Sequence, residues 1–264
     1  MKRLLVVCLL AFGAAGVLSA ENVTVRYAEG LLRGFLLLRP PGGAVIANGD
    51  HVQFVRGDRV TARLTFRFRD GSVQEETTVF SQRRQFRLLS DHYVQRGPAF
   101  PHPVDLSINA TTGRVVVKHR DKDGEEKTID EHMELPTDLA NGMMITLLKN
   151  LSTDVPTTTV PMLFATPKPQ LVNLVITRVG KEPFSVGRAS YRATRFNIHV
   201  DIGGLKGTIA KLIGKQPLDT SVWVLGGDAP GFVRSEGQFY QDGPVWRIEL
   251  AAPDYPQGRG RAGR

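Results

Sequence analysis

The sequence predicts a mainly β protein, built as a strongly curved antiparallel sheet or unclosed β-barrel with one or two amphipathic helices against it. Three observations lead to this fold class. One stretch alternates strictly between apolar and polar residues, a series of short strand-like segments is separated by turn residues, and two segments carry apolar residues at helical spacing. Short strands at such intervals are typical of sandwiches and barrels, and an apolar helix face needs a sheet to cover.

Residues 1–20 have the pattern of a signal peptide. Two basic residues precede an apolar run at 4–18, and small residues suited to cleavage end it. Cleavage after Ser19 and cleavage after Ala20 both fit the pattern, and a retained membrane anchor is the alternative use of the run. We therefore expect an exported chain, periplasmic or extracellular, that is soluble after signal cleavage.

Charge and cysteine content narrow the class of protein. Residues 1–20 hold two of the 34 Lys+Arg and none of the 26 Asp+Glu, so the mature chain keeps 32 against 26, a net charge of +6. The single cysteine, Cys8, lies in the predicted signal, so the mature chain has no thiol for a disulfide or a metal site. No Lys/Arg cluster alternates with aromatic residues as on nucleic-acid surfaces. We expect no nucleic-acid partner and no cofactor.

The clearest strand is predicted at 59–69, where every second residue is apolar and arginines fill much of the other face. Period two separates these two sets onto opposite faces of a sheet. Burying guanidinium groups costs more free energy than apolar burial returns, so we predict that Leu64, Phe66 and Phe68 point inward. The outward set provides solubility, meets an acidic partner, or meets an anionic membrane surface through Arg59, Arg63 and Arg67. Arg69 shares this face.

The other strands are predicted at 72–82, 86–95, 105–109, 114–119, 125–133, 157–165, 170–179, 186–202, 220–225, 232–240 and 245–250. Residue pairs that tolerate positive φ mark tight hairpin turns, at Asp70-Gly71, Asp123-Gly124 and Asp242-Gly243. No linker rich in Pro, Gly or Ser divides the strands, so we expect one β-rich domain over 21–252. Residues 253–264 are predicted to be a disordered basic tail.

Two helices are predicted near 137–151 and 204–214. In the first, Thr137 or Asp138 can cap the N-terminus, and apolar residues then recur at spacings of three and four. This helix either packs as ordinary core or forms a lid over an apolar cavity inside the curved sheet. The nine residues predicted to line that cavity are Leu64, Phe66, Phe68, Leu139, Met143, Met144, Leu147, Phe196 and Ile198.

Motifs for chemistry are weak in this sequence. Residues 258–263 match a dinucleotide-binding fingerprint, but the chain ends one residue later, without the strand and helix that this motif needs. The six histidines are scattered, with no two at a metal-ligand spacing, and no Gly-x-Ser-x-Gly elbow is present. The sequence therefore predicts a non-enzymatic protein with no catalytic, cofactor or metal residues. A hydrolase with a dispersed catalytic set is an alternative.

Three segments carry a family resemblance. They are residues 109–115 (NATTGRV), residues 135–143 (LPTDLANGM) and residues 243–248 (GPVWRI). Together they resemble a group of uncharacterised exported bacterial β-meander proteins. The order of meander and helix is similar, more remotely, to the periplasmic lipoprotein carriers LolA and LolB, which are unclosed β-barrels with helical lids over an apolar cavity. This likeness is architectural, and none of the carriers' functional residues is placed on this sequence.

The leading functional hypothesis is a non-enzymatic periplasmic protein that binds a hydrophobic ligand in the concave face of the sheet. The ligand would be a lipid, an acyl chain or a lipidated protein, and the cavity would be lined by apolar side chains with few polar groups. The alternative from another class is an envelope scaffold or assembly factor that binds a protein partner through a sheet edge or the arginine-rich face. A filled core would favour that alternative.

Overall fold

The computed structural model describes residues 23–251 with the exception of 122, 153, 167, 187–188 and 202–215. Three predicted segments lie outside the described residues, namely the signal peptide at 1–20, the helix at 204–214 and the basic tail at 253–264.

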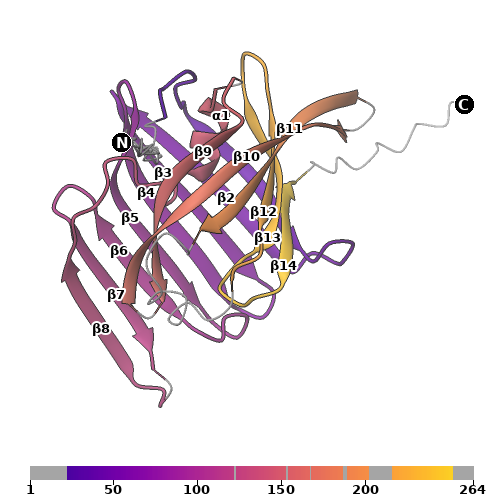
Figure 1. Cartoon of the computed structure of the whole chain (residues 1–264). Helices are drawn as coiled ribbons and strands as arrows, with labels where there is room; N and C mark the ends of the chain where they lie inside the picture. Colours follow the sequence, from indigo (N-terminus) through magenta and orange to yellow (C-terminus); the bar gives the residue numbers. More distant parts are fainter. Residues whose placement is uncertain are drawn as a thin grey trace, which may run out of the picture.

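The described chain is mainly β, which confirms the predicted fold class. Among the described residues, fourteen antiparallel strands form one sheet, with one short helix beside it (Figure 1). Eight strands precede the helix: β1 (Leu32–Arg39), β2 (Ala47–Arg56), β3 (Arg59–Phe68), β4 (Val73–Gln82), β5 (Phe86–Arg96), β6 (Val104–Asn109), β7 (Arg114–Arg120) and β8 (Glu126–His132). After α1 (Met144–Asn150) come β9 (Thr157–Thr166), β10 (Lys168–Val186), β11 (Ala189–Asp201), β12 (Thr220–Leu225), β13 (Gly231–Gln238) and β14 (Val245–Leu250).

The sheet consists of two meanders joined through the strands nearest the two ends of the described chain. Each strand pairs with its neighbours in sequence, and β1 also pairs with β14, so that the order runs from β8 through β1 and β14 to β9. Within the described residues no ladder joins β8 to β9, and β10 packs against β7 across the opening. Figure 1 shows the sheet curled so that β9–β11 lie in front of β2–β7. The result is an unclosed barrel.

Two apolar clusters lie on the inside of the sheet. The larger cluster combines the inner faces of β3–β7 with those of β9–β12 and with α1, whose Leu147 and Leu148 are buried. The smaller cluster is aromatic and involves β3, the segment around Phe100, and the end of β13. Its rings meet edge to face, with centroids 5.3 Å apart for Phe66 and Phe239 and 5.2 Å apart for Phe68 and Phe100. Such ring contacts stabilise the cluster beyond simple area burial.

The predicted helix at 137–151 is wrong in its first half. The helix begins only at Met144, its N-cap is Met143, and neither of the predicted caps bonds to it. Residues 139–143 form a turn because Gly142 has a φ of +65° and because Asn141 pairs with β9 instead of continuing a helix. Among the described residues, no helix is long and apolar enough to cross a bilayer.

The predicted orientation of the strand at 59–69 is confirmed. Its arginines are exposed, Phe66 and Phe68 are buried, and Leu64 is half-buried. Strands β1 and β2 were not predicted, since Asn48-Gly49-Asp50 interrupts the alternation in β2. The fold explains the glycine there, because a Cβ on Gly49 would come within 2.6 Å of the Phe66 ring.

Candidate functional site

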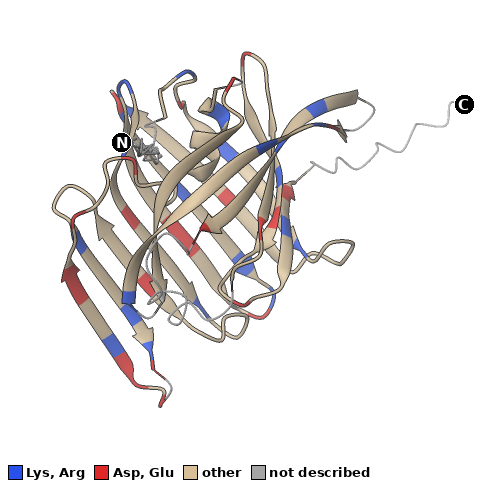
Figure 2. Cartoon of the chain, in the orientation of Figure 1, with Lys and Arg blue, Asp and Glu red and all other residues tan. Residues whose placement is uncertain are grey.

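One end of the barrel concentrates exposed arginines. The β2–β3 and β4–β5 turns lie at the same end, because the strands are antiparallel neighbours in one sheet. Exposed arginines flank or form both turns, and we call these five residues the basic rim: Arg56, Arg59, Arg83, Arg84 and Arg87. Figure 2 shows the charged positions among the described residues. The register explains the clustering, because Ser81 of β4 pairs with both Arg59 and Arg87.

Three of these arginines line a pocket of 910 Å³ at the β4–β5 turn. Its lining consists of Thr24, Asp58, Ser81, Arg83, Arg84, Gln85 and Arg87. Asp58 is the one acid in this lining, and it lies 3.5 Å from Arg83 and accepts a hydrogen bond from the Ser81 hydroxyl at 3.3 Å. Three guanidinium groups against one carboxylate leave the pocket positively charged. Arginine forks and a hydroxyl are groups that bind phosphate oxygens.

The segment before β1 holds the arginine turn in place. Thr24 forms a β-bridge with Gln85, and the Val25 N–H donates to the Arg84 carbonyl at 3.0 Å. The Phe86 N–H in turn donates to the Val23 carbonyl at 3.2 Å. These backbone bonds fix the main chain of the turn while the guanidinium groups of Arg83 and Arg84 stay exposed. The basic rim is therefore presented by an anchored turn.

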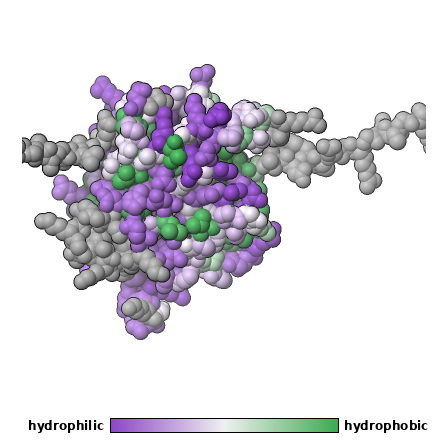
Figure 3. All heavy atoms as spheres, turned by 45° about the vertical axis from the view of Figure 1, so that its right-hand side comes forward, coloured by the Kyte–Doolittle hydropathy of each residue, from purple (hydrophilic) through white to green (hydrophobic). Residues whose placement is uncertain are grey.

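Exposed apolar side chains lie beside the basic rim. β1 begins at this end, since its Leu32 pairs with Gln53 near the end of β2. Leu31 is 79% exposed, and Phe54, two residues before Arg56, is 58% exposed. The face in Figure 3 is largely hydrophilic, with hydrophobic side chains in small separated groups. A neighbourhood of exposed aromatic and arginine side chains marks an interaction surface better than a scattered apolar residue does.

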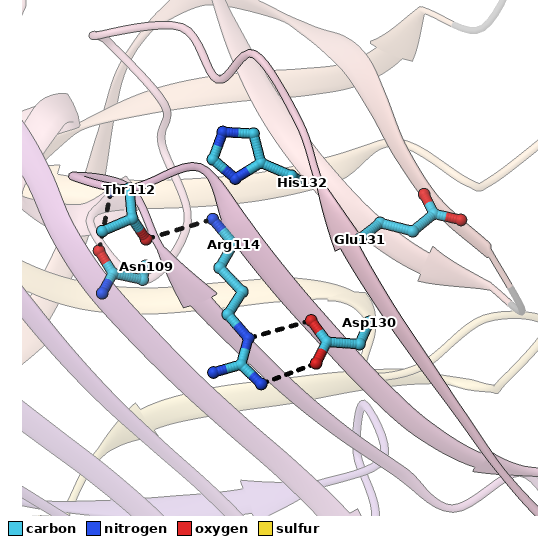
Figure 4. A pocket seen from close by; sticks show the side chains of 6 residues that line it. All are labelled: Asn109, Thr112, Arg114, Asp130, Glu131 and His132. Carbon is cyan, nitrogen blue, oxygen red and sulfur yellow. Dashed lines mark hydrogen bonds and ion pairs between the residues drawn. The ribbon is translucent and has the colours of Figure 1, made fainter.

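A second pocket, of 510 Å³, lies between the β6–β7 turn and β8 (Figure 4). Arg114 points along this pocket toward Asp130 and donates to both of its carboxylate oxygens, at 3.0 and 2.7 Å. The hydrogen bonds from Arg114 hold the pKa of the Asp130 carboxyl below its ordinary value. This guanidinium is already paired with a carboxylate in a fork geometry. We therefore expect the pocket to bind an anion more weakly than the basic rim does.

The nine predicted cavity residues do not form one group. Leu64, Phe66 and Phe68 belong to the smaller aromatic cluster or pack against it. The other six belong to the larger cluster or pack against it, namely Leu139, Met143, Met144, Leu147, Phe196 and Ile198. None of the nine lines either pocket. Binding of a hydrophobic ligand by these residues stays a prediction.

The predicted membrane-facing arginines are brought together only in part. Arg59, Arg63 and Arg67 are all exposed, but only Arg59 lies at the basic rim, and the other two follow along β3 at roughly 13 Å steps away from it. Sequence reasoning missed Arg83 and Arg84. The signal was present, since an Arg-Arg pair lies between two predicted strands and therefore in a hairpin turn.

The described residues give no support to a metal centre or a hydrolytic set. They contain no group of three or more His, Cys, Asp or Glu side chains that could hold a metal ion. Two His–carboxylate pairs occur, His92–Asp105 at 2.9 Å and His199–Asp219 at 2.7 Å, and both are on the surface. Within the described part of the chain, neither histidine has a hydrogen bond to a hydroxyl group.

Comparison with known proteins identifies no family. No family model matches the chain, and the curated proteins contain no match. One similar solved structure is described as the crystal structure of a beta-barrel-like protein of domain of unknown function DUF1849 from Brucella abortus. It has 11% sequence identity and a TM-score of 0.46, over 86% of this chain and 97% of that chain.

Proposed function

We propose that the protein binds the surface of an anionic membrane, outside the cytoplasm, through its basic rim and the exposed apolar side chains beside it. The observation that carries this proposal is that one end of the barrel combines five exposed arginines with exposed Leu31 and Phe54. Lipid phosphates attract the guanidinium groups, and the apolar zone beneath the head groups accepts aromatic and aliphatic side chains. The predicted signal peptide supports an extracytoplasmic site of action.

The arginines supply most of the expected binding free energy. A basic residue close to an anionic leaflet contributes about 1 kcal/mol at physiological ionic strength. The three arginines that line the larger pocket would then contribute about 3 kcal/mol, or roughly 100-fold in affinity. This attraction weakens as salt rises, because the screening length shrinks from about 10 Å at 0.1 M to about 3 Å at 1 M.

Vesicle sedimentation tests the proposal. We expect the protein to bind vesicles of phosphatidylglycerol and phosphatidylcholine, and to bind pure phosphatidylcholine vesicles far less. The triple variant Arg83→Ser, Arg84→Ser, Arg87→Ser should lose roughly 100-fold in affinity for the anionic vesicles. The double variant Leu31→Ser, Phe54→Ser should weaken the binding that persists at high salt.

A matched control removes the same charge elsewhere. The triple variant Arg63→Ser, Arg67→Ser, Arg69→Ser changes exposed arginines on and next to β3, away from the basic rim, and should keep most of the binding. Equal losses in the two triple variants would mean that net charge alone matters, and the proposed surface would be rejected. Absence of vesicle binding would instead favour the scaffold hypothesis, with an acidic protein partner at the same arginines.

A further inference from the structure

The inner face of β2–β5 carries a row of largely polar side chains between the two apolar clusters. The row consists of residues that are register partners on successive strands, namely His51, Leu64, Glu76 and Tyr93. On β3, Ala62 belongs to the larger cluster and Phe66 to the smaller one, so that Leu64 lies between them. The row therefore runs across the inside of the barrel where the apolar packing changes from one cluster to the other.

The row keeps accessible surface although it faces inward. His51, Glu76 and Tyr93 are partly exposed, whereas Thr78 and Asp91, the next positions along the same face, are buried. Each of these three residues therefore keeps a part of its surface that a water-sized group can reach. In apolar surroundings, side chains that remain accessible and polar are where a polar ligand or ordered water binds.

Two hydrogen-bond acceptors beside the row have no partner. Asp91 accepts the Thr78 hydroxyl through Oδ1 at 2.8 Å, but its Oδ2 is free of any hydrogen bond among the described residues. Gln74 precedes Glu76 on the same face of β4, and its Oε1 likewise has no partner in the described part of the chain. Asp91 is 2% exposed and Gln74 is 4% exposed. Buried acceptors of this kind cost stability unless a donor meets them.

Carboxyl groups outnumber cations around the row. Burial raises the pKa of Glu76 well above its ordinary value, with Asp91 adding to the effect, and burial raises the pKa of Asp91 to about 6. His51 does not balance them, because burial and the nearby Lys149 lower its pKa. Lys149 itself is ion-paired with Glu29. The row therefore has acidic groups and free acceptors that a positively charged donor would satisfy.

We propose that this row binds the ammonium group of an amphiphilic primary amine, whose hydrocarbon part packs on Leu64 and the neighbouring apolar cluster. A primary ammonium carries three donors, which suits Glu76 flanked by Asp91 Oδ2 and Gln74 Oε1. A metal ion fits less well, since the described residues hold no group of three metal-binding side chains. The site is separate from the basic rim, so the proposal of amine binding can be tested independently of membrane binding.

Calorimetric titration with three probes of equal chain length tests the proposal: octylammonium chloride, octanol and octanoate. The purified protein should bind octylammonium about tenfold or more tightly than octanol, and octanoate more weakly than both. Glu76→Gln should remove this preference. The matched control is Glu75→Gln, which changes the adjacent carboxylate on the opposite face of β4 and should keep the preference.

Three results would overturn the assignment. The first is equal affinity for the three probes, which would indicate an apolar site without a polar head-group contact. The second is no binding of any probe, which would mean that ordered water alone satisfies Asp91 and Gln74. The third is an unchanged preference in Glu76→Gln. If Glu76→Gln does not fold by circular dichroism, Asp91→Asn replaces it, with the same loss of preference expected.

Discussion

Strands β8 and β9 are the two edges of the sheet, but the chain treats them in different ways. The free edge of β9 is covered by the turn at 139–143. The Asn141 side chain donates to the Leu163 carbonyl and accepts from the Leu163 N–H, both at 2.9 Å, and the Ala140 N–H donates to the Pro161 carbonyl at 2.8 Å. By contrast, β8 is exposed along nearly its whole length, and Figure 2 shows acidic and basic positions along this projecting strand.

The difference shows two solutions to the same problem. An open edge presents unpaired N–H and C=O groups that another chain can pair with. On β9 the Asn141 side-chain amide forms the two hydrogen bonds that the backbone of a neighbouring strand would form. The edge N–H and C=O of Leu163 therefore have partners within the protein. On β8 charged side chains discourage pairing without covering it. We therefore expect the covered edge to contribute to folding stability and the charged edge to contribute little. Four substitutions and one control test this comparison.

The largest effect is expected for Gly142→Ala in the covering turn. Gly142 has a φ of +65°, and a Cβ there would lie 1.8 Å from the Thr78 hydroxyl. The combined cost of positive φ and overpacking is about 3 to 4 kcal/mol. Urea unfolding followed by circular dichroism measures it. Gly124→Ala, with a φ of +82° and open space around it beside β8, should cost only about 1 kcal/mol. Equal costs would contradict the comparison.

Asn141→Ala should have the second largest effect. Asn141 is 3% exposed, and its loss leaves the Leu163 N–H and C=O without partners. Leaving buried backbone groups unsatisfied costs about 2 to 3 kcal/mol in total. Urea unfolding gives this value, and hydrogen exchange should show faster exchange of the Leu163 amide. Unchanged exchange at Leu163 would mean that Asn141 does not protect the edge.

Asp91→Asn should change how stability depends on pH. Asp91 accepts the hydroxyl of Thr78, the residue on which the covering turn rests, and burial raises its pKa from 3.8 to about 6. The folded state holds this proton more tightly than the unfolded chain, so stability is lost as pH rises from about 4 through about 6. The variant should be more stable than the parent at pH 7.5, by about 2 kcal/mol, and equal at pH 4. A difference independent of pH would refute this.

Arg114→Ala, on β7 next to the charged edge, should have the smallest effect. The side chains of the Arg114–Asp130 pair are 64% and 48% exposed, and exposed ion pairs contribute little to stability. The urea midpoint should stay unchanged, but the strand beside the edge loses a charge that discourages pairing. Light scattering at high protein concentration should therefore detect more association than in the parent. A large shift of the midpoint would show that β8 is part of the cooperative core.

Local patterns allowed much of the β structure to be predicted. Strict alternation placed β3 and its two faces correctly, and the Asp70-Gly71 turn has the expected positive φ at Gly71. Sequence patterns failed where contacts between distant segments override them. β2 keeps a glycine because the Phe66 ring lies against it, and residues 139–143 leave the helix because Asn141 pairs with β9. Neither contact leaves a periodic signal.

The sequence by itself determined the fold class and the outward arginines of β3, because both depend on a two-residue period that can be seen within one segment of the sequence. Only the tertiary structure brought Arg59 together with Arg83, Arg84 and Arg87, since strand pairing decides which turns share an end. It also separated the nine predicted cavity residues into two clusters and aligned His51, Glu76 and Tyr93 inside the barrel. The physical reason is register: the alternation sets which face a side chain takes, but the pairing of strands sets its neighbours.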